Sequence, residues 1–445
     1  MSQLPTPTKS RLVALTESEK AMTSVSSVLR SASIVSIGTL IGQLAAFVGS
    51  LALVRIYSPE QMGVFTTVVA IASFISPLAS GRLSNAIPLP LSNLSAIAIF
   101  KISLYGAGLI SALIALSVVI FTLATGGTVE SSTLWWWAVP ALVMSLVVYT
   151  GTNALAVRFE RYLGLALRGV LYPSTMTVAQ ILLGLVHFGS AGLILGMVLG
   201  HIITAGTIWF PIRHLAKEEQ PSTTNWRQLL KEYRHFPLAL GPAGAVNSLA
   251  MQIPQIGMTV IFGLAVGGQF GMMMKILAVP IVLLGQSIGF VYGGHIAKAR
   301  RAGEKDVRHL YDRMSLLLGG VATAFAVLAF FLAEPVFAWL LGEEWRMAGQ
   351  FAALYMLASG MQLVASPLSR TLVVSERTSQ QFTIDGLRAT SLALAFVLLN
   401  FFDVEAYTAV VSISVVSMLG YFALWLLNRV AAANIRPSLS YQESS

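Results

Sequence analysis

Apolar residues occupy most of the chain in long runs that do not alternate with polar residues. A membrane-spanning helix needs roughly 20 predominantly apolar residues, and twelve runs come near this length. The runs fall near residues 31–54, 62–80, 99–124, 133–157, 168–187, 190–212, 237–262, 268–293, 314–333, 349–371, 380–401 and 405–427. Because the alternation that is typical of barrel strands is absent, this pattern predicts an all-α polytopic membrane protein with about twelve transmembrane helices.

The basic residues fall on one side of this twelve-span order. Of the 28 Lys and Arg residues, all but three lie in the two tails or in turns on that side. Arg55 and Arg346 lie on the other side, and Lys275 lies within a span. Basic turns are retained in the cytoplasm, so the distribution predicts that both termini are cytoplasmic.

Composition excludes several classes of protein. With 56% hydrophobic and 11% charged residues, the chain cannot cover the outside of a soluble fold. The net charge of +9 sits in short turns and forms no basic stripe, so we expect no nucleic-acid partner. There is no Cys, which removes disulfides and thiolate sites. The polar start of the chain has no cleavable signal pattern.

The two halves of the chain resemble each other. Residues 55–65 (RIYSPEQMGVF) and 261–272 (IFGLAVGGQFGM) both close one span and open the next, which aligns Gly63 with Gly271. This predicts two pseudo-symmetric six-helix bundles around a central cavity. The predicted order is an amino tail (1–30), a first bundle (31–212), a cytoplasmic linker (213–236), a second bundle (237–428) and a carboxyl tail (429–445).

Four stretches carry a resemblance to a known family. They are GQLAAFVGSLALVRIYSPEQMGVF (42–65), SGRLSNAIPLP (80–90), HFPLALGPAGAVNSLAMQIPQIGMTVIFG (235–263) and LLGEEWRMAGQFAALYMLASGMQLVASPLSRTLVVSER (340–377). In this order they resemble the oligosaccharide flippase (polysaccharide biosynthesis) family of the multidrug and oligosaccharidyl-lipid exporter superfamily. One departure is Met272-Met273-Met274-Lys275, which stands where relatives tend to have small residues and an Arg.

The resemblance implies a function. A flippase of this family would move an undecaprenyl-pyrophosphate-linked oligosaccharide across the bacterial inner (plasma) membrane by alternating access, for exopolysaccharide, capsule or O-antigen. Its partners would be the lipid-linked oligosaccharide and membrane lipids, with a polysaccharide polymerase and its chain-length machinery as further candidates. A cation-coupled multidrug exporter of the same superfamily is the first alternative, and a membrane-embedded polymerase or ligase is the second. We expect no catalytic residues, metal or cofactor.

Three cations are candidates for binding the pyrophosphate. Lys275 lies inside a span, where a lysine costs at least ~2.5 kcal/mol; it either serves the ligand or extends to the interface. Arg82 follows the second span and either captures substrate or is an ordinary cytoplasmic arginine. Arg55 either guards the outer mouth of the cavity or anchors its helix end beside Glu60.

Polar residues near the spans complete the candidates. Amides suit sugar hydroxyls and also bond helices to one another. They are Gln43, Asn247, Gln252, Gln255, Gln269 and Gln286. Asp385 shares a helix face with Arg388, which predicts an ion pair or, alternatively, ion coupling. The matching Glu160-Arg161 and Glu376-Arg377 turns are either solvated or an inner gate.

Overall fold

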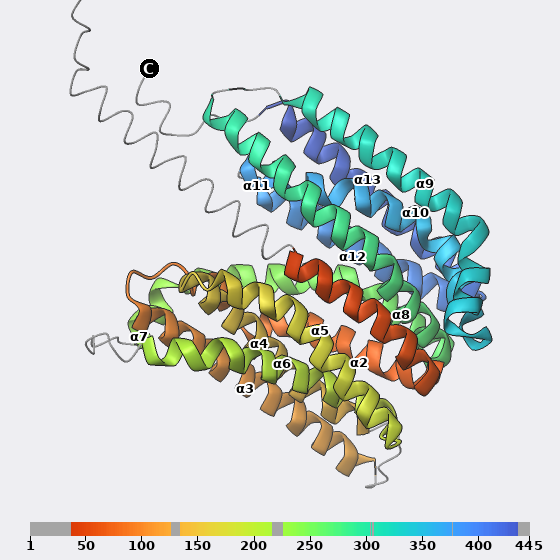
Figure 1. The fold of residues 1–445 in the computed structure, drawn as a ribbon, viewed down its shortest axis with the longest axis horizontal. Coiled ribbons are helices and arrows are strands. Elements are labelled where there is room, and N and C mark those ends of the chain that lie inside the picture. Colours follow the sequence, from red (N-terminus) through yellow and green to blue (C-terminus); the bar gives the residue numbers. More distant parts are fainter. Residues whose placement is uncertain are drawn as a thin grey trace, which may run out of the picture.

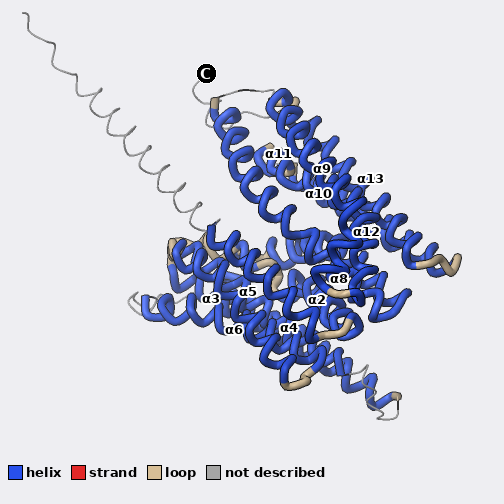
Figure 2. Tube along the Cα trace, turned by 45° about the vertical axis from the view of Figure 1, so that its right-hand side comes forward, coloured by secondary structure: helices blue, strands red, loops and turns tan. Residues whose placement is uncertain are grey.

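The computed structural model describes residues 37–125, 134–215, 226–302, 304, 307–375 and 377–434. In this part of the chain every regular element is a helix (Figure 2). The predictions about the amino tail and about Glu376 concern residues outside the described part.

The helices form two bundles. The first contains the helix Ile37–Ile56, α2 (Pro59–Ala79), α3 (Asn93–Ala124), α4 (Ala138–Arg158), α5 (Tyr162–Leu185) and α6 (Gly189–Leu215). The second contains α8 (Gly241–Arg301), α9 (Arg308–Leu341), α10 (Arg346–Leu368), α12 (Thr378–Phe401) and α13 (Ala406–Ala432). Short helices lie in the connections: η1 (Leu83–Asn85), η2 (Leu134–Trp137), α7 (Trp226–Glu232), η3 (Phe236–Leu240), η4 (Glu343–Trp345) and α11 (Arg370–Val374).

Helix α8 supplies two spans. It runs for 61 residues, but Gly263 has φ 86° and ψ 173° and divides it into a first arm (241–262) and a second arm (264–301). Glycine suits this position because a side chain strongly disfavours it. Ten helices of the described residues are long and apolar enough to cross a membrane, and one of them contains this bend. Counting both arms and α5, which has 24 residues, confirms the prediction of about twelve spanning helices in two bundles.

The turn before α2 shows how the sequence sets one of these boundaries. Ser58 caps the helix, because its hydroxyl accepts a hydrogen bond from the Gln61 backbone N–H (3.3 Å) and its own N–H donates to the Gln61 side chain (3.2 Å). Pro59 follows at the first helical position, where its missing N–H costs nothing. The Ser-Pro-Glu sequence therefore ends the first span and starts the second within a few residues.

The bundles meet through two glycines. A Cβ on Gly63 of α2 would collide with the Leu264 carbonyl and lie 3.1 Å from the Gly268 nitrogen. A Cβ on Gly268 would collide with the Pro59 carbonyl and lie 2.9 Å from the Gly63 nitrogen. The contact is reciprocal, so Gly63 corresponds to Gly268 and not, as the sequence suggested, to Gly271. Small residues such as glycine allow two helix backbones to approach this closely.

We call the end of the molecule that holds this contact the joined end. Large side chains pack together at this end. Trp345 is fully buried, and its Nε1 donates a hydrogen bond to the Val54 carbonyl of the first helix (3.3 Å). Tyr57 and Phe270 belong to the same hydrophobic cluster. The joined end therefore has a packed apolar core that contains residues of both bundles.

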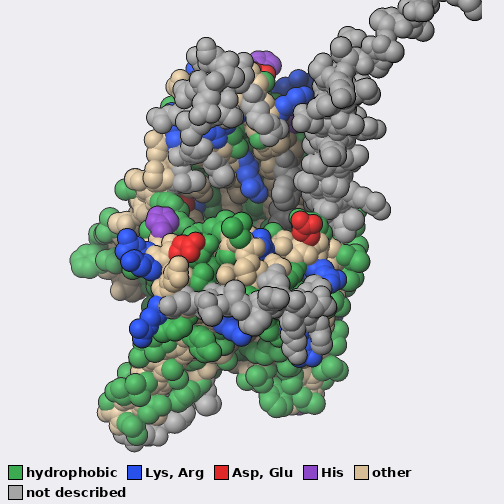
Figure 3. Space-filling view, turned by 90° about the vertical axis from the view of Figure 1, so that its left-hand side faces the viewer, with side chains coloured by type: hydrophobic (Ala, Val, Ile, Leu, Met, Phe, Trp, Pro, Cys, Tyr) green, Lys and Arg blue, Asp and Glu red, His purple; other side chains and the backbone are tan. Residues whose placement is uncertain are grey.

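The opposite end, which carries α7, α11 and most of the described basic turns, is called the basic end. The two bundles separate toward it (Figure 1). Figure 3 looks at this end and shows a hollow between the bundles, with Lys and Arg side chains around it. The short helix η3, which leads into α8, packs here against the first bundle, since a Cβ on Gly81 would lie 2.8 Å from Pro237. The described structure is therefore open at the basic end and closed at the joined end.

Candidate functional site

Lys275 lies on the face of α8 that meets α2. In the second arm, Leu264, Gly268 and Gly271 contact α2, and residues spaced three or four apart share a helix face. Lys275 is four residues beyond Gly271, one turn farther toward the basic end. It is half-buried, and none of the ion pairs between described residues includes it. This places a single cation just inside the point where the two bundles separate.

Arg82 lies at the basic end, between α2 and the start of α8. Its backbone is left-handed (φ 50°), and its half-buried guanidinium packs against Gly244, where a Cβ would collide with it. Burial lowers the pKa of this guanidinium. Arg82 therefore connects the first bundle to α8 and stands far from the joined end, where Arg55 is an exposed residue near the end of the first helix.

The remaining charged candidates lie in or next to the turns, Arg55 at the joined end and Glu160 and Arg161 at the basic end. Arg55 makes no ion pair with Glu60, so the anchoring contact considered from the sequence is not seen. Glu160 and Arg161 are exposed, and within the described residues they form no ion pair with Arg377. The gate role of these turns stays a prediction.

Asp385 and Arg388 form a buried ion pair within α12. Arg388 Nη2 lies 3.6 Å from Asp385 Oδ1, and both side chains are 5% exposed. Asn247 of α8 donates a hydrogen bond to the other carboxylate oxygen at 2.6 Å, and the Arg388 guanidinium stacks on the Tyr421 ring at 4.5 Å. The carboxylate is thus engaged on both oxygens, as an internal ion pair requires.

Half of the six candidate amides bond to the protein itself. Asn247 binds Asp385, as described above. Gln255 donates to Thr66 and to the Gly267 carbonyl, and Gln269 donates to the Glu344 carbonyl and accepts from the Ala348 N–H. Gln43 and Gln252 are half-buried and make no hydrogen bond to a described residue, and the side chain of Gln286 lies outside the described part. Gln43 and Gln252 therefore remain available to a ligand.

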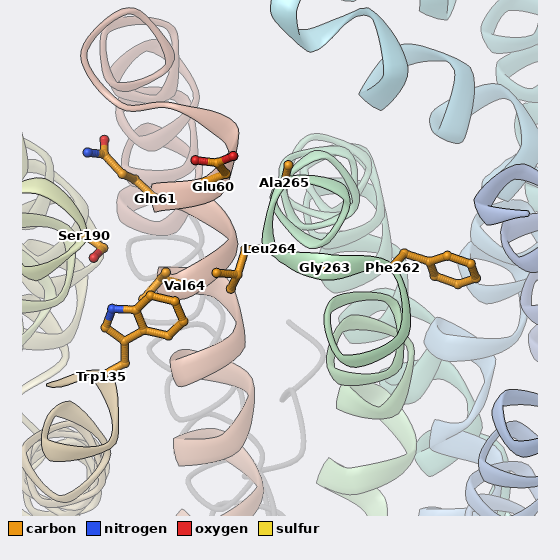
Figure 4. A pocket seen from close by; sticks show the side chains of 9 residues that line it. All are labelled: Glu60, Gln61, Val64, Trp135, Ser190, Phe262, Gly263, Leu264 and Ala265. Carbon is orange, nitrogen blue, oxygen red and sulfur yellow. The ribbon is translucent and has the colours of Figure 1, made fainter. Parts of the chain in front are cut away.

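A pocket of about 440 Å³ lies at the joined end (Figure 4). It is bounded by α2, η2, the start of α6 and the bend of α8, and Trp135 and Val64 line its floor. Among the described residues that line it, Glu60 is the only charged one (Figure 4). A carboxylate would repel a pyrophosphate, so this pocket does not fit the predicted substrate.

Sequence reasoning missed a basic and aromatic cluster in the first bundle, in which His201 is buried and the other members are half-buried. Arg168 of α5 stacks on the Tyr149 ring of α4 at 4.4 Å. The rings of Tyr149, Tyr172 and His201 of α6 form a triangle, with centroids 4.7, 4.8 and 4.9 Å apart. The sequence singled out neither Arg168 nor His201 as a candidate. The available signal was the spacing of Arg168 and Tyr172, which puts both on one face of α5.

Comparison with known proteins identifies the family. A family profile described as polysaccharide biosynthesis protein matches residues 52–349, which is more than half of the chain. The chain belongs to this family. No curated protein matches the sequence.

Solved structures share the fold at low sequence identity. The lipid II flippase MurJ in an inward closed conformation has a TM-score of 0.68 at 13% identity, covering 90% of this chain and 89% of its own. A MOP superfamily transporter from Pyrococcus furiosus, described as having a binding pocket of reverse polarity, has a TM-score of 0.60 at 15% identity and covers 92% and 96%. A mutant of a Vibrio cholerae MATE transporter has a TM-score of 0.57 at 14% identity and covers 92% and 98%. This polysaccharide biosynthesis protein therefore has the fold of the MOP superfamily of membrane transporters.

Proposed function

We propose that the protein is a flippase that moves an undecaprenyl-pyrophosphate-linked oligosaccharide from the cytoplasmic to the periplasmic leaflet of a bacterial inner membrane. The family match to polysaccharide biosynthesis and the transporter fold support this function. The observation that carries it is the position of Lys275 at the apex of the opening between the bundles. The product would supply surface polysaccharide, as exopolysaccharide, capsule or O-antigen.

The basic end faces the cytoplasm in this proposal. Cytoplasmic turns are enriched in Lys and Arg, and Arg82, Arg158, Arg161 and Arg377 all lie at that end. Both termini then lie in the cytoplasm. A substrate made in the cytoplasmic leaflet would meet the open side of the molecule, with Arg82 near its path and its polyprenyl chain left in the lipid.

The cost of burying a lysine supports a ligand role for Lys275. A lysine at the centre of a bilayer costs at least ~2.5 kcal/mol, and no described carboxylate pairs with Lys275 to offset that cost. A pyrophosphate would provide the missing negative charge, and Lys would bind it as a point charge without the bidentate geometry of Arg. The family's tendency to have an Arg in this segment agrees with a cation being needed.

Alternating access would follow from the way the bundles are held. In the described conformation they touch through Gly63 and Gly268 at the joined end and separate at the basic end. Rocking about this contact would close the basic end and expose the headgroup to the periplasm. The substrate would need to stabilise the second conformation relative to the first.

The test is flipping of a pyrophosphate-linked polyprenyl glycan in proteoliposomes. Wild type is compared with Lys275→Ala and Lys275→Arg, and with Lys101→Ala, because Lys101 is an exposed lysine of α3. We expect transport by wild type, by Lys275→Arg and by Lys101→Ala, and loss of transport in Lys275→Ala. Full transport by Lys275→Ala would show that Lys275 is not the contact that binds the substrate.

A multidrug exporter is the second candidate, and the same vesicles distinguish it. Such a transporter needs an acidic group in its cavity for cationic drugs, and the candidate acid, Asp385, is already bonded to Arg388 and Asn247. Export of cationic dyes by wild type, with no movement of any lipid-linked glycan, would replace the flippase function by this one.

A further inference from the structure

The first bundle contains a polar cluster that the proposed transport path at Lys275 does not use. Four side chains make up what we call the Arg168 cluster: Tyr149 of α4, Arg168 and Tyr172 of α5, and His201 of α6. The rings of Tyr172 and His201 are stacked, with an angle of 4° between them. Ser145 fixes the orientation of His201, since its hydroxyl lies 3.0 Å from His201 Nδ1. The cluster is thus a preformed arrangement of rings around one guanidinium.

Several buried polar atoms around this cluster have no hydrogen-bond partner among the described residues. Arg168 Nε is one, Asn153 Oδ1 of α4 is another, and Thr204 Oγ1 of α6 is a third. Asn153 follows Tyr149 by four residues and Thr204 follows His201 by three, so each lies on the same helix face as a member of the cluster. Buried polar groups are almost always bonded in native proteins. Three unsatisfied buried atoms on three adjoining helices favour the binding of a polar group at this place.

The charge of Arg168 also has no counter-ion within the described part of the chain. The acidic residues of the first bundle are Glu60, Glu130 and Glu160, and none of them falls within an apolar run of the sequence. No carboxylate of the first bundle can therefore sit beside Arg168 inside the membrane. An unpaired cation within a membrane span is costly and is retained where it has a function.

The second bundle provides the comparison. Arg388 of α12 also stacks on a tyrosine ring, at 4.5 Å compared with 4.4 Å for Arg168. Helices α5 and α12 are the fifth span of their bundles, so the two arginines occupy corresponding helices. Arg388 has Asp385 at 3.6 Å, whereas none of the ion pairs between described residues includes Arg168. One bundle thus supplies its own counter-ion, and the other leaves the position of the counter-ion open.

We propose that the Arg168 cluster is a second anion site, which binds a carboxylate or phosphate group of the transported headgroup. The guanidinium would bind the anionic oxygens through charge-assisted hydrogen bonds. The tyrosine hydroxyls and His201 would bond neighbouring hydroxyls, and the rings provide faces on which a sugar can stack. The inference rests on the proposed function for the source of the anion, and it assigns an acidic headgroup contact to the first bundle, separate from Lys275 in the second.

The test measures anion binding by the purified full-length protein in detergent, using isothermal titration calorimetry. The probes are glucuronic acid, inorganic pyrophosphate and farnesyl pyrophosphate, which separate a sugar carboxylate, a free phosphate and a lipid-borne phosphate. Arg168→Gln removes the charge and Arg168→Lys keeps it. Arg213→Gln is the matched control, because Arg213 stacks on the Phe210 ring at 4.7 Å but is exposed.

We expect wild type to bind at least one probe, and Arg168→Gln to weaken that binding by about tenfold, as the loss of a charge-assisted bond predicts. Arg168→Lys should retain most of the affinity, and Arg213→Gln all of it. Asn153→Asp tests the site without removing the arginine: an internal carboxylate on the same face of α4 should displace the anion and raise the Tm. If Arg168 only stabilised the fold, Asn153→Asp would not change the affinity of the protein for the anion.

The outcomes separate this inference from the flippase function. No binding of any probe by wild type, or equal binding by wild type and Arg168→Gln, overturns the anion site even if glycan flipping is seen. Binding that depends on Arg168, in a protein that flips no polyprenyl glycan, keeps the anion site and removes the flippase function.

Discussion

Gln255 of α8 donates a hydrogen bond to the Thr66 hydroxyl of α2 (3.0 Å) and another to the Gly267 carbonyl beyond the bend of α8 (3.0 Å). One amide thus connects both arms of α8 to the first bundle. We expect Gln255→Leu to cost about 1 kcal/mol, since interhelical hydrogen bonds in membranes are worth roughly this much. Differential scanning fluorimetry should show a lower Tm, with Gln252→Leu as the control. A Tm equal to that of wild type would mean that the hydrogen bonds of Gln255 do not stabilise the contact between α8 and the first bundle.

The glycine contact predicts that the conformation can be shifted at one position. A Cβ at Gly63 has no room against the Leu264 carbonyl, so Gly63→Ala should force the bundles apart at the joined end and favour closure of the basic end. Because the chain has no Cys, spin labels at Tyr162→Cys and Gln380→Cys, both exposed at the basic end, report this distance by electron paramagnetic resonance.

The label distance at the basic end should shorten in Gly63→Ala. Gly108→Ala is the control, because a Cβ at Gly108 would meet no other atom within 4 Å. An unchanged distance in Gly63→Ala would show that the contact between Gly63 and Gly268 does not determine how often the basic end is open or closed.

The buried pair on α12 predicts a strong coupling between two substitutions. Asp385→Asn leaves the Arg388 charge buried without its partner, which should cost about 3 kcal/mol. Combining it with Arg388→Met should recover most of that loss, as measured by a double-mutant cycle on unfolding. If Asp385→Asn keeps its stability but transport no longer responds to a proton or sodium gradient, ion coupling is the role of Asp385.

We expect Trp345 to stabilise the packing of the joined end. Trp345→Phe keeps a ring but removes the bond from Nε1 to the Val54 carbonyl and leaves unfilled volume, which should cost about 2 kcal/mol. Trp339→Phe is the control, because Trp339 is 81% exposed. Equal Tm values for the two variants would contradict a stabilising role for the buried indole.

Much of the fold could be predicted because the membrane imposes simple local rules. Apolar length marks each span, and the Ser58 cap and the Gly263 bend come from sequence signals that act over a few residues. The register between the halves could not be predicted in the same way. The pairing of Gly63 with Gly268 depends on which backbones touch, and Gly271 carries the same local signal.

The site was predicted only in part, for a related reason. Lys275 stands out because a charge within an apolar run is visible in one segment. The partners of Gln255 and the cluster around Arg168 depend on residues from several helices, and a single sequence does not show which faces meet. The absence of acidic residues from the apolar runs of the first bundle was visible in the sequence. It becomes informative only once Arg168 is placed within α5 beside the rings of Tyr149 and Tyr172.

The reciprocal contact of Gly63 and Gly268 has the form of an interface in a symmetric homodimer, in which each copy presents the same patch to the other. Six spans return a chain to the side of the membrane where it began, so two copies of a six-span protein would insert side by side and meet in this way. Duplication and fusion of such a gene would preserve the contact on the axis while freeing each copy to change elsewhere. The arginines of the two bundles, Arg388 and Arg168, would then record that divergence: one copy carries a carboxylate beside its arginine, and the other carries none among the described residues.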